Sequence, residues 1–252
     1  MSWLLVRYDR FGAARYLSHL DTARAIQRTF ARAGIAVARS RGMRPKARLS
    51  LGLPLPVGTA AENELILVEL AGDEAGRGPL ELLRALRAAA PEGLAVAAVD
   101  DGGQRPRLTP LQAEYECDVA GEAAALERAL AWFAEQSEVP VERVSPKGRK
   151  VVDLKKYVED TWVRPRARGA RLGFSVRHAE GGAARPQEFV RLVAERAGAE
   201  PVMRDLLRRR VTYKGLPAQD KRASGPRGMR TRGRTQRRCV AASGSGAAAG
   251  RG

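Results

Sequence analysis

The chain has 252 residues, of which 44% are hydrophobic and 5% aromatic, enough to form one large core or two smaller ones. No stretch approaches the roughly 18 apolar residues of a membrane-spanning helix, and the N-terminal residues lack the features of a secretory signal, so we expect a cytoplasmic protein that does not use a membrane. The net charge of +17 favours a polyanionic partner, and the distant cysteines Cys117 and Cys239 exclude a disulfide framework.

The N-terminal part alternates between strand and helix patterns. Residues 3–8 predict a strand. Ser18 is a good helix N-cap, with Asp21 three residues later, and Gly34 closes the expected helix. The next predicted elements are a strand at 35–38, a loop or a pair of irregular extended pieces at 39–58, a strand at 64–70, a helix at 79–90 and a strand at 94–99. This order of elements predicts a ferredoxin-like sheet.

The pattern then repeats without detectable sequence identity. The predicted elements are strands at 111–119, 139–144, 170–176 and 206–213, with helices at 122–136 and 186–197. The conformation of residues 146–164 stays open. We therefore expect an α+β fold of two tandem ferredoxin-like (βαββαβ) units: residues 1–104, which include the basic loop 39–58, and residues 105–213.

The positive charge is concentrated near the C-terminus. Residues 204–252 hold 14 Lys and Arg against 2 Asp and Glu, so they carry +12 of the net +17. Residues 214–252 form an Arg/Gly-rich tail without apolar periodicity, which predicts disorder. This imbalance favours contact with RNA or DNA; the alternative is a tail that only increases solubility.

The expected helix after Ser18 has two faces. Its apolar face consists of Leu20, Ala23, Ile26, Phe30 and Ala33. Its opposite face carries an arginine stripe, which consists of Arg24, Arg28 and Arg32. Such a stripe can follow the phosphates of a nucleic acid, although a solvated face is the commoner role of this spacing.

His19 is a weak catalytic candidate together with Asp21. A neutral imidazole near pH 7 can transfer protons, and a neighbouring carboxylate can orient it. The alternatives are that His19 contacts a ligand without reacting, or that it packs locally while Asp21 pairs with Arg24.

The loop after the helix is dense in cations and backbone-permissive residues. Its cations are Arg39, Arg41, Arg44, Lys46 and Arg48, and Gly42 and Pro45 lie among them. Like charges at this density repel unless an anion is near, so we predict a binding loop. We expect Glu62 and Glu64 to neutralise the loop rather than to catalyse. The full set of candidate RNA- or ligand-binding residues is Ser18, His19, Arg24, Arg28, Arg32, Arg41, Gly42, Arg44, Pro45, Lys46 and Arg48.

These residues resemble a known family, the bacterial radical-SAM-linked domain of unknown function. The resemblance rests on residues 15–21 (Arg-Tyr-Leu-Ser-His-Leu-Asp), Arg28, residues 32–34, 40–45, 49–50 and 53–58, Glu62, Tyr115, residues 147–153 and residues 185–186. It covers roughly residues 6–213. The chain departs from the family at Met43 and Arg44, where phenylalanine and asparagine are usual, and at Lys46, where histidine is usual.

The resemblance implies a radical-SAM protein as partner and an RNA-linked context, but no reaction. We therefore expect a non-catalytic accessory protein that binds RNA and works with a radical-SAM enzyme in tRNA or rRNA modification or maturation. One alternative is a metal-independent endoribonuclease or RNA-modifying enzyme that uses His19. Another is a protein-interaction scaffold. No motif predicts a cofactor, a metal site or an iron–sulfur cluster. The RNA target, the partner's reaction and the oligomeric state stay open.

Overall fold

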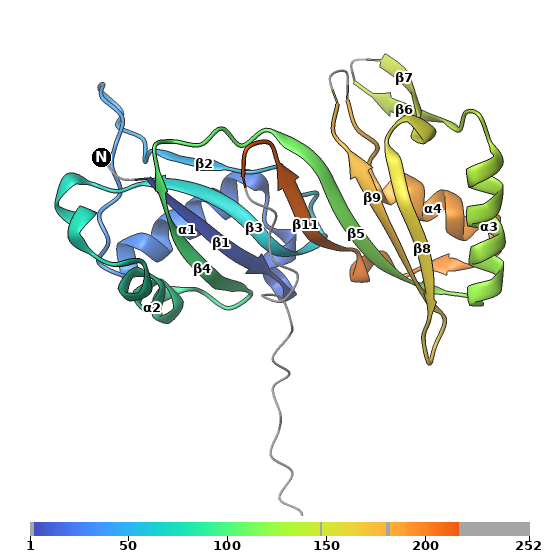
Figure 1. The fold of residues 1–252 in the computed structure, drawn as a ribbon, viewed down its shortest axis with the longest axis horizontal. Coiled ribbons are helices and arrows are strands. Elements are labelled where there is room, and N and C mark those ends of the chain that lie inside the picture. The colour runs from blue at the N-terminus through green and yellow to red at the C-terminus, as the bar shows by residue number, and fades with distance from the viewer. Residues whose placement is uncertain (1–2, 147, 180–181, 217–252) are drawn as a thin grey trace, which may run out of the picture.

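The computed structural model describes residues 3–146, 148–179 and 182–216 (Figure 1). The described helices are α1 (His19–Arg32), α2 (Pro79–Ala89), α3 (Ala123–Glu135) and α4 (Pro186–Arg196), with 3-10 turns η1 (Gly12–Tyr16), η2 (Gly72–Gly76), η3 (Leu154–Lys156) and η4 (Met203–Asp205). The described strands are β1 (Trp3–Arg10), β2 (Leu49–Leu51), β3 (Ala60–Glu69), β4 (Leu94–Gly103), β5 (Pro110–Ala120), β6 (Pro140–Ser145), β7 (Gly148–Asp153), β8 (Val158–Pro165), β9 (Ala170–Arg177), β10 (Glu200–Pro201) and β11 (Leu207–Tyr213). The predicted tail lies outside the described residues from position 217 onward.

One mixed sheet of nine strands extends across both halves of the described chain. Its order is β4-β1-β3-β11-β5-β9-β8, with β2 beside β3 and β10 beside β5. The described pairs are antiparallel except β3 with β11, whose parallel register covers only Leu207↔Ala60 and Arg208↔Ala61. The two halves of the chain are therefore joined edge to edge by a short parallel contact.

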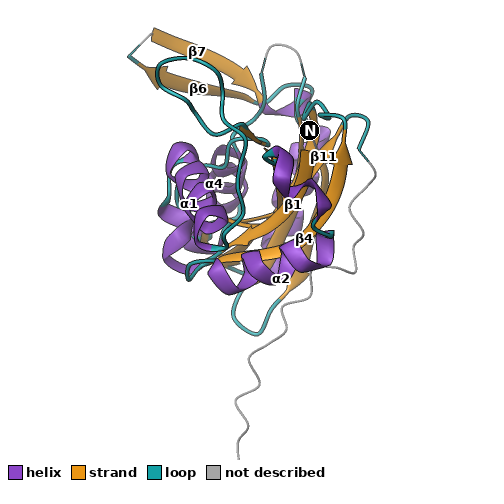
Figure 2. Cartoon of the chain, turned by 90° about the vertical axis from the view of Figure 1, so that its left-hand side faces the viewer, coloured by secondary structure: helices purple, strands orange, loops and turns teal. Residues whose placement is uncertain are grey.

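The helices bury one face of this sheet in each half. Figure 2 shows α1 and α4 on the same side of the sheet. In the first half, Ile26 and Phe30 of α1 pack with Ile66 of β3 in one cluster of buried apolar residues. In the second half, the Phe174 ring of β9 lies 4.7 Å from the Phe189 ring of α4. The mixed α+β class is confirmed.

The second strand of the first half differs from the prediction. The structure has only an isolated bridge, Val37↔Leu70, at residues 35–38. The strand is β2, which pairs with β3 at Leu49↔Val68 and Leu51↔Ile66. Of the two alternatives predicted for residues 39–58, the structure has irregular extended pieces: the bridge Arg39↔Ala47 and β2.

In the second half, the strand predicted at 139–144 is confirmed, but it pairs with β7 in a separate two-stranded hairpin. The strand that completes the main sheet is β8, within the residues whose conformation the pattern left open. Asp160 has a positive φ of 50°, and the register of β8 shifts between Glu159 and Trp162. This irregularity breaks the alternation from which a strand is recognised.

No helix of the described residues is long and apolar enough to cross a membrane.

Candidate functional site

The cations of the first half are concentrated in residues 22–61, which we call the basic segment. It holds eight arginines and lysines and no aspartate or glutamate. It folds into most of α1, a hairpin and β2. Any carboxylate that neutralises these cations must therefore come from elsewhere in the sequence.

The start of α1 follows the predicted cap. The Ser18 Oγ accepts a hydrogen bond from the Asp21 N–H at 3.1 Å and donates one to the Asp21 carboxylate at 2.6 Å. The Arg24 guanidinium donates to the same carboxylate at 2.9 Å. These contacts, led by the Ser18 hydrogen bond, lower the pKa of Asp21. The Asp21 carboxylate is thus committed to Ser18 and Arg24, and its action on His19 stays a prediction.

The prediction that Leu20 belongs to the buried apolar face of α1 is wrong. Leu20 is 66% exposed, whereas Ile26 and Phe30 are buried. The buried face is completed by Thr22 and Thr29, whose hydroxyls donate to backbone carbonyls one turn earlier. The sequence pattern missed these two residues because threonine is polar, although its methyl group packs in a core once its hydroxyl is satisfied.

The members of the arginine stripe differ in their contacts. Arg24 pairs with Asp21 on the surface. The Arg32 Nε donates to the Ala89 carbonyl at 3.0 Å, so Arg32 holds the last residue of α2. Arg28 is exposed and has no ion pair within the described residues. Arg28 is therefore the member of the stripe best placed to bind an external anion.

Residues 39–47 form a hairpin that extends from the body of the molecule, which we call the basic hairpin (Figure 1). Its base is closed by the bridge Arg39↔Ala47, and Ser40 exchanges hydrogen bonds with Lys46 at 2.8 and 3.0 Å. Gly42 has a φ of 122°, a conformation that favours glycine.

Every residue of the basic hairpin from Ser40 to Lys46 is exposed. This stretch includes five candidate residues of the loop: Arg41, Gly42, Arg44, Pro45 and Lys46. Within the described residues, no carboxylate pairs with Arg41, Arg44 or Lys46. The predicted binding loop is thus an exposed, unneutralised cationic surface.

Arg48 has a different environment. Its guanidinium pairs with the carboxylate of Glu69 at 2.8 Å, and its Cζ lies 5.9 Å from the centre of the Trp3 ring. Glu69 is 1% exposed. Arg48 therefore anchors β2 to β3, and its contribution to ligand binding stays a prediction.

Glu62 and Glu64 do not neutralise the basic loop as predicted. The Glu62 carboxylate accepts from the Arg209 Nη1 at 2.6 Å, and the Glu64 carboxylate accepts from Arg208 at 2.6 and 2.7 Å. Both arginines lie on β11, more than 140 positions later in the sequence. Burial raises the pKa of Glu62, and Arg209 opposes that shift.

Arg208 connects β11, on which it lies, with β3 and with the segment that contains Leu53 and Pro54. Besides its bidentate pair with Glu64, its guanidinium donates to the carbonyls of Leu53 and Pro54 at 2.7 and 3.0 Å. Arg10 acts similarly at the end of β1, where it donates to the Thr22 hydroxyl at 3.0 Å. Both arginines are almost completely buried, and their donors are used mainly for internal contacts.

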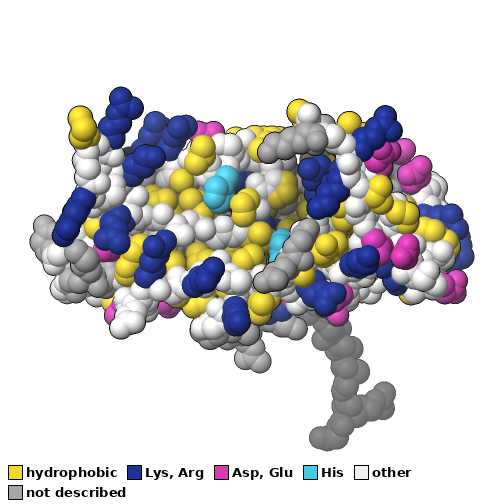
Figure 3. Space-filling view, turned by 90° about the horizontal axis from the view of Figure 1, so that it is seen from above, with side chains coloured by type: hydrophobic (Ala, Val, Ile, Leu, Met, Phe, Trp, Pro, Cys, Tyr) yellow, Lys and Arg dark blue, Asp and Glu magenta, His cyan; other side chains and the backbone are white. Residues whose placement is uncertain are grey.

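Burial and the positive charge of Arg208 lower the pKa of both His19 and His178. Burial lowers the pKa of His19, and the charges of Arg208 and Arg10 lower it further. Burial and Arg208 also lower the pKa of His178. Figure 3 shows both histidines of the chain on one face. His178 could not be singled out from the sequence, because it follows a strand of the second half without a recognisable motif.

Several arginines of β9 and β11 pair with carboxylates of neighbouring strands. The Arg171 Nε lies 2.6 Å from the Asp118 carboxylate, Arg209 also contacts Glu116, and further arginines of β11 pair with glutamates of β3 and β5. In Figure 3, basic side chains gather toward the left end of the face shown, with few acidic ones among them. The named arginines of β9 and β11 are therefore paired with carboxylates, whereas the exposed cations of the basic hairpin are not, within the part of the chain that the structure describes.

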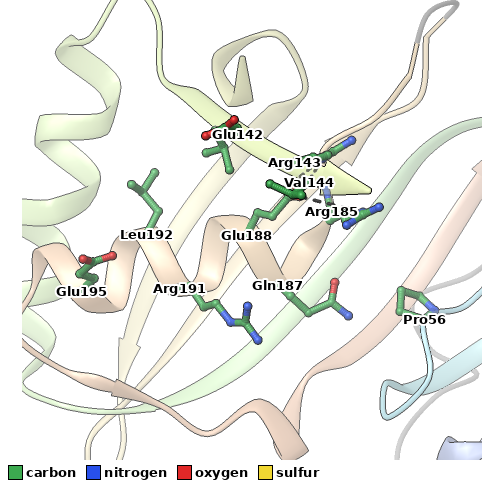
Figure 4. Close-up of a pocket in the computed structure, with 11 residues that line it drawn as sticks. Pro56, Glu142, Arg143, Val144, Arg185, Gln187, Glu188, Arg191, Leu192 and Glu195 are labelled. Atoms are coloured by element: carbon green, nitrogen blue, oxygen red, sulfur yellow. Dashed lines mark hydrogen bonds and ion pairs between the residues drawn. The ribbon is translucent and has the colours of Figure 1, made fainter. Parts of the chain in front are cut away.

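A cavity of about 640 Å³ lies between α4 and β6 (Figure 4). Arg143 spans it and pairs with Glu188 at 2.6 Å, and Arg191 and Glu195 line it from α4. Its lining carries as many arginines as glutamates. This balance gives the cavity no net preference for an anion.

Within the described residues, no group of three or more His, Cys, Asp or Glu side chains has an arrangement that could hold a metal ion.

Two solved structures show distant similarity to the chain. The chain resembles a chain in the crystal structure of a Cbf5-Nop10-Gar1 complex, with a TM-score of 0.44 and 12% identity over 82% of this chain and 48% of that one. It also resembles a protein described as "putative glycine cleavage system transcriptional repressor", with a TM-score of 0.24 and 8% identity over 84% of this chain and 98% of that one. Neither similarity supports a conclusion about function.

No curated protein matches the sequence. A family model described as "Uncharacterized protein conserved in bacteria (DUF2344)" matches residues 4–186. The match includes the basic segment, both histidines and all four helices at least in part. Because it covers well over half of the sequence, the chain belongs to this family of uncharacterized bacterial proteins.

Proposed function

We propose that this protein binds RNA through its basic segment, as a cytoplasmic, non-catalytic accessory protein of a radical-SAM enzyme in tRNA or rRNA modification or maturation. The observation that carries the RNA part is the exposed, carboxylate-free surface formed by Arg28 and the basic hairpin. The partner follows from the resemblance of the motifs around His19 to radical-SAM-linked domains.

The physical argument starts from repulsion between like charges. Three cations of the basic hairpin lie within six positions, on an exposed turn without an acidic neighbour in the described structure. A polyanion removes this repulsion, and its condensed counterions are released on binding. Elsewhere in the protein, cations such as Arg171 and Arg209 are paired internally. The contrast favours RNA contact on the α1 and hairpin side.

We also propose that each half is a ferredoxin-like unit. Across the sheet, the four main strands of the first half lie in the order β4-β1-β3-β2, and those of the second half in the order β11-β5-β9-β8. In each half the strands are counted here by their position along the chain. Both arrangements place the fourth strand beside the first and the second at the opposite edge, as expected of a split βαβ unit. This shared order supports tandem units at 1–104 and 105–213.

Direct binding measurements test the RNA proposal. We expect the variant Arg41→Ala/Arg44→Ala/Lys46→Ala to bind a labelled RNA at least tenfold more weakly than the unmodified full-length chain, in fluorescence anisotropy at fixed salt. The matched control, Arg84→Ala/Arg128→Ala, removes exposed arginines from α2 and α3 and should change the affinity less than threefold. Equal affinity for the hairpin variant and the unmodified chain would contradict RNA contact by this surface.

The partner is tested separately. Purification of the tagged full-length chain from its own cells, after nuclease treatment, should retain a radical-SAM protein identified by mass spectrometry. If the radical-SAM protein is retained only when RNA is intact, the two proteins associate through RNA rather than through direct protein contact. Complete absence of a radical-SAM protein before and after nuclease treatment would refute the accessory role.

A second candidate function is an RNA-cleaving or RNA-modifying enzyme that uses His19. It is favoured by one observation: burial and the charges of Arg208 and Arg10 lower the pKa of His19, which favours the neutral imidazole that a general base requires. This reading predicts that His19→Ala abolishes turnover of RNA while its RNA affinity changes little. Turnover that persists in His19→Ala would exclude it.

A further inference from the structure

A groove of about 390 Å³ separates the C-terminal half of α1 from the base of the basic hairpin. Its principal lining residues are Gln27, Ala31, Ile35, Val37, Arg39 and Ala47. The groove lies wholly within the basic segment, so any ligand in it is next to the cationic surface described above.

The groove has an apolar floor and two polar side chains. Ile35 is 3% exposed and closes the floor, with Val37 and Ala31 beside it. Gln27 and Arg39 supply the polar groups of the lining side chains, and the Arg39 Nη1 lies 3.5 Å from the Pro45 carbonyl. A mostly apolar pocket with a few polar groups is typical of sites for small organic groups.

The backbone around the groove leaves its N–H groups largely satisfied. The Ile35 N–H donates to the Phe30 carbonyl at 3.0 Å, and the Ala36 N–H donates to Glu74 at 3.1 Å. Glu74 also pairs with Arg77 at 3.1 Å, so its charge is matched by a cation. The groove is therefore lined largely by apolar groups, and its acidic neighbour Glu74 is matched by a cation.

The charges at the edges of the groove indicate the ligand. Arg39 lines the groove, and two exposed cations adjoin lining residues in the sequence: Arg28 next to Gln27, and Lys46 next to Ala47. A ligand that fits must combine a flat, largely apolar group with negative charge on more than one side. A nucleotide within an RNA strand has this combination, because its base is flat and phosphates precede and follow it.

We propose that the groove receives the base of one unpaired nucleotide of the bound RNA. The inference rests on the proposed RNA-binding function and adds the class of RNA, which is single-stranded at this contact. The Gln27 side-chain amide hydrogen-bonds to the base edge, the Arg39 guanidinium stacks on the base, and the neighbouring cations hold the flanking phosphates. A base paired within a duplex stays stacked between its neighbours and does not enter the groove.

The test fills the groove without changing charge. Ala31→Leu adds bulk to an exposed position of α1 and keeps a good helix former. Ala131→Leu is the matched control at an exposed position of α3. The binding of both variants and the unmodified full-length chain is measured by fluorescence anisotropy at one salt concentration. The probes are a 12-nucleotide single-stranded RNA and the blunt-ended duplex that it forms with its complementary strand.

The unmodified chain should prefer the single strand. Ala31→Leu should lose about tenfold on the single strand, within the range of one lost base-stacking contact, and less than twofold on the paired RNA. Ala131→Leu should match the unmodified chain on both probes. Gln27→Ala should weaken single-strand binding several-fold.

Other outcomes separate this inference from the proposed function. Equal losses on both probes, or no loss for Ala31→Leu, would overturn the groove assignment. If the neutralised basic hairpin still reduced affinity in that case, RNA binding by the basic segment would stand without the groove. If neither change affected binding to either RNA, both proposals would fail.

Discussion

The buried pair of Arg208 and Glu64 provides a stability prediction with a calculable size. Arg208 is 0% exposed, and two hydrogen bonds of 2.6 and 2.7 Å join it to Glu64, which is 3% exposed. The replacement Arg208→Met keeps the length of the side chain but leaves the carboxylate buried without its partner. Breaking a buried pair in this way costs about 3–5 kcal/mol of unfolding free energy. The carbonyls of Leu53 and Pro54 also lose a donor, so we expect the upper part of this range.

Urea unfolding followed by circular dichroism measures this loss. The double variant Arg208→Met/Glu64→Leu should be more stable than Arg208→Met alone, because it also removes the unpaired carboxylate. Arg149→Met is the matched control: its pair with Glu142 is exposed, so the change should cost less than about 1 kcal/mol. A loss below about 1 kcal/mol for Arg208→Met, or a double variant less stable than the single one, would refute this reasoning.

Three further predictions concern single positions. Ser18→Ala removes the cap of α1 and should cost about 1 kcal/mol in urea unfolding, whereas Ser18→Asp should cost much less; equal losses would contradict the capping role. The lowered pKa of His19 means that the unfolded chain takes up a proton at higher pH than the folded chain, so stability falls as the pH drops below about 6.5. The variant His19→Gln should show a shallower fall in its urea midpoint, and an unchanged pH dependence would argue against a shifted histidine. Gly52→Ala places a Cβ 2.0 Å from the Tyr213 hydroxyl oxygen and should cost about 1–3 kcal/mol, whereas Gly72→Ala, with open space around it, serves as the control.

Local chemistry explains which parts of the fold could be predicted from the sequence. The N-cap at Ser18 and the closing glycine, Gly34, act within one helical turn, and both are confirmed. Pro79 and Pro186 occupy the first positions of α2 and α4, as their fixed φ favours. Signals of this kind depend only on neighbouring residues, so they can be recognised in the sequence without knowledge of the tertiary structure.

The missed features depend on contacts between distant residues. β2 is three residues long and is defined by its pairing with β3 rather than by its own pattern. β8 was obscured by the positive φ of Asp160. The partners of Glu64 and Glu62 lie on β11, more than 140 positions away, so proximity in sequence wrongly assigned both carboxylates to the basic loop.

The candidate site shows the same division. The exposed cations of the basic hairpin follow from composition alone, because residues 22–61 contain no carboxylate. Two contacts could not be predicted: the pair of Arg48 with Glu69, and the hydrogen bond from Arg32 to the Ala89 carbonyl. Both depend on how β2, β3 and α2 pack in the folded chain. Among the predicted cations, Arg28 and those of the exposed part of the hairpin have no ion pair within the described residues, and RNA binding by any of the set stays a prediction.

The most direct test of the central claim is the salt dependence of RNA binding. For single-stranded RNA, each phosphate contact contributes about 0.7 to the slope of log K against log salt concentration. Loss of Arg41, Arg44 and Lys46 should therefore lower the magnitude of that slope by about 2 if each cation contacts one phosphate. A slope that is the same in the unmodified chain and in the variant would contradict RNA binding by the basic hairpin.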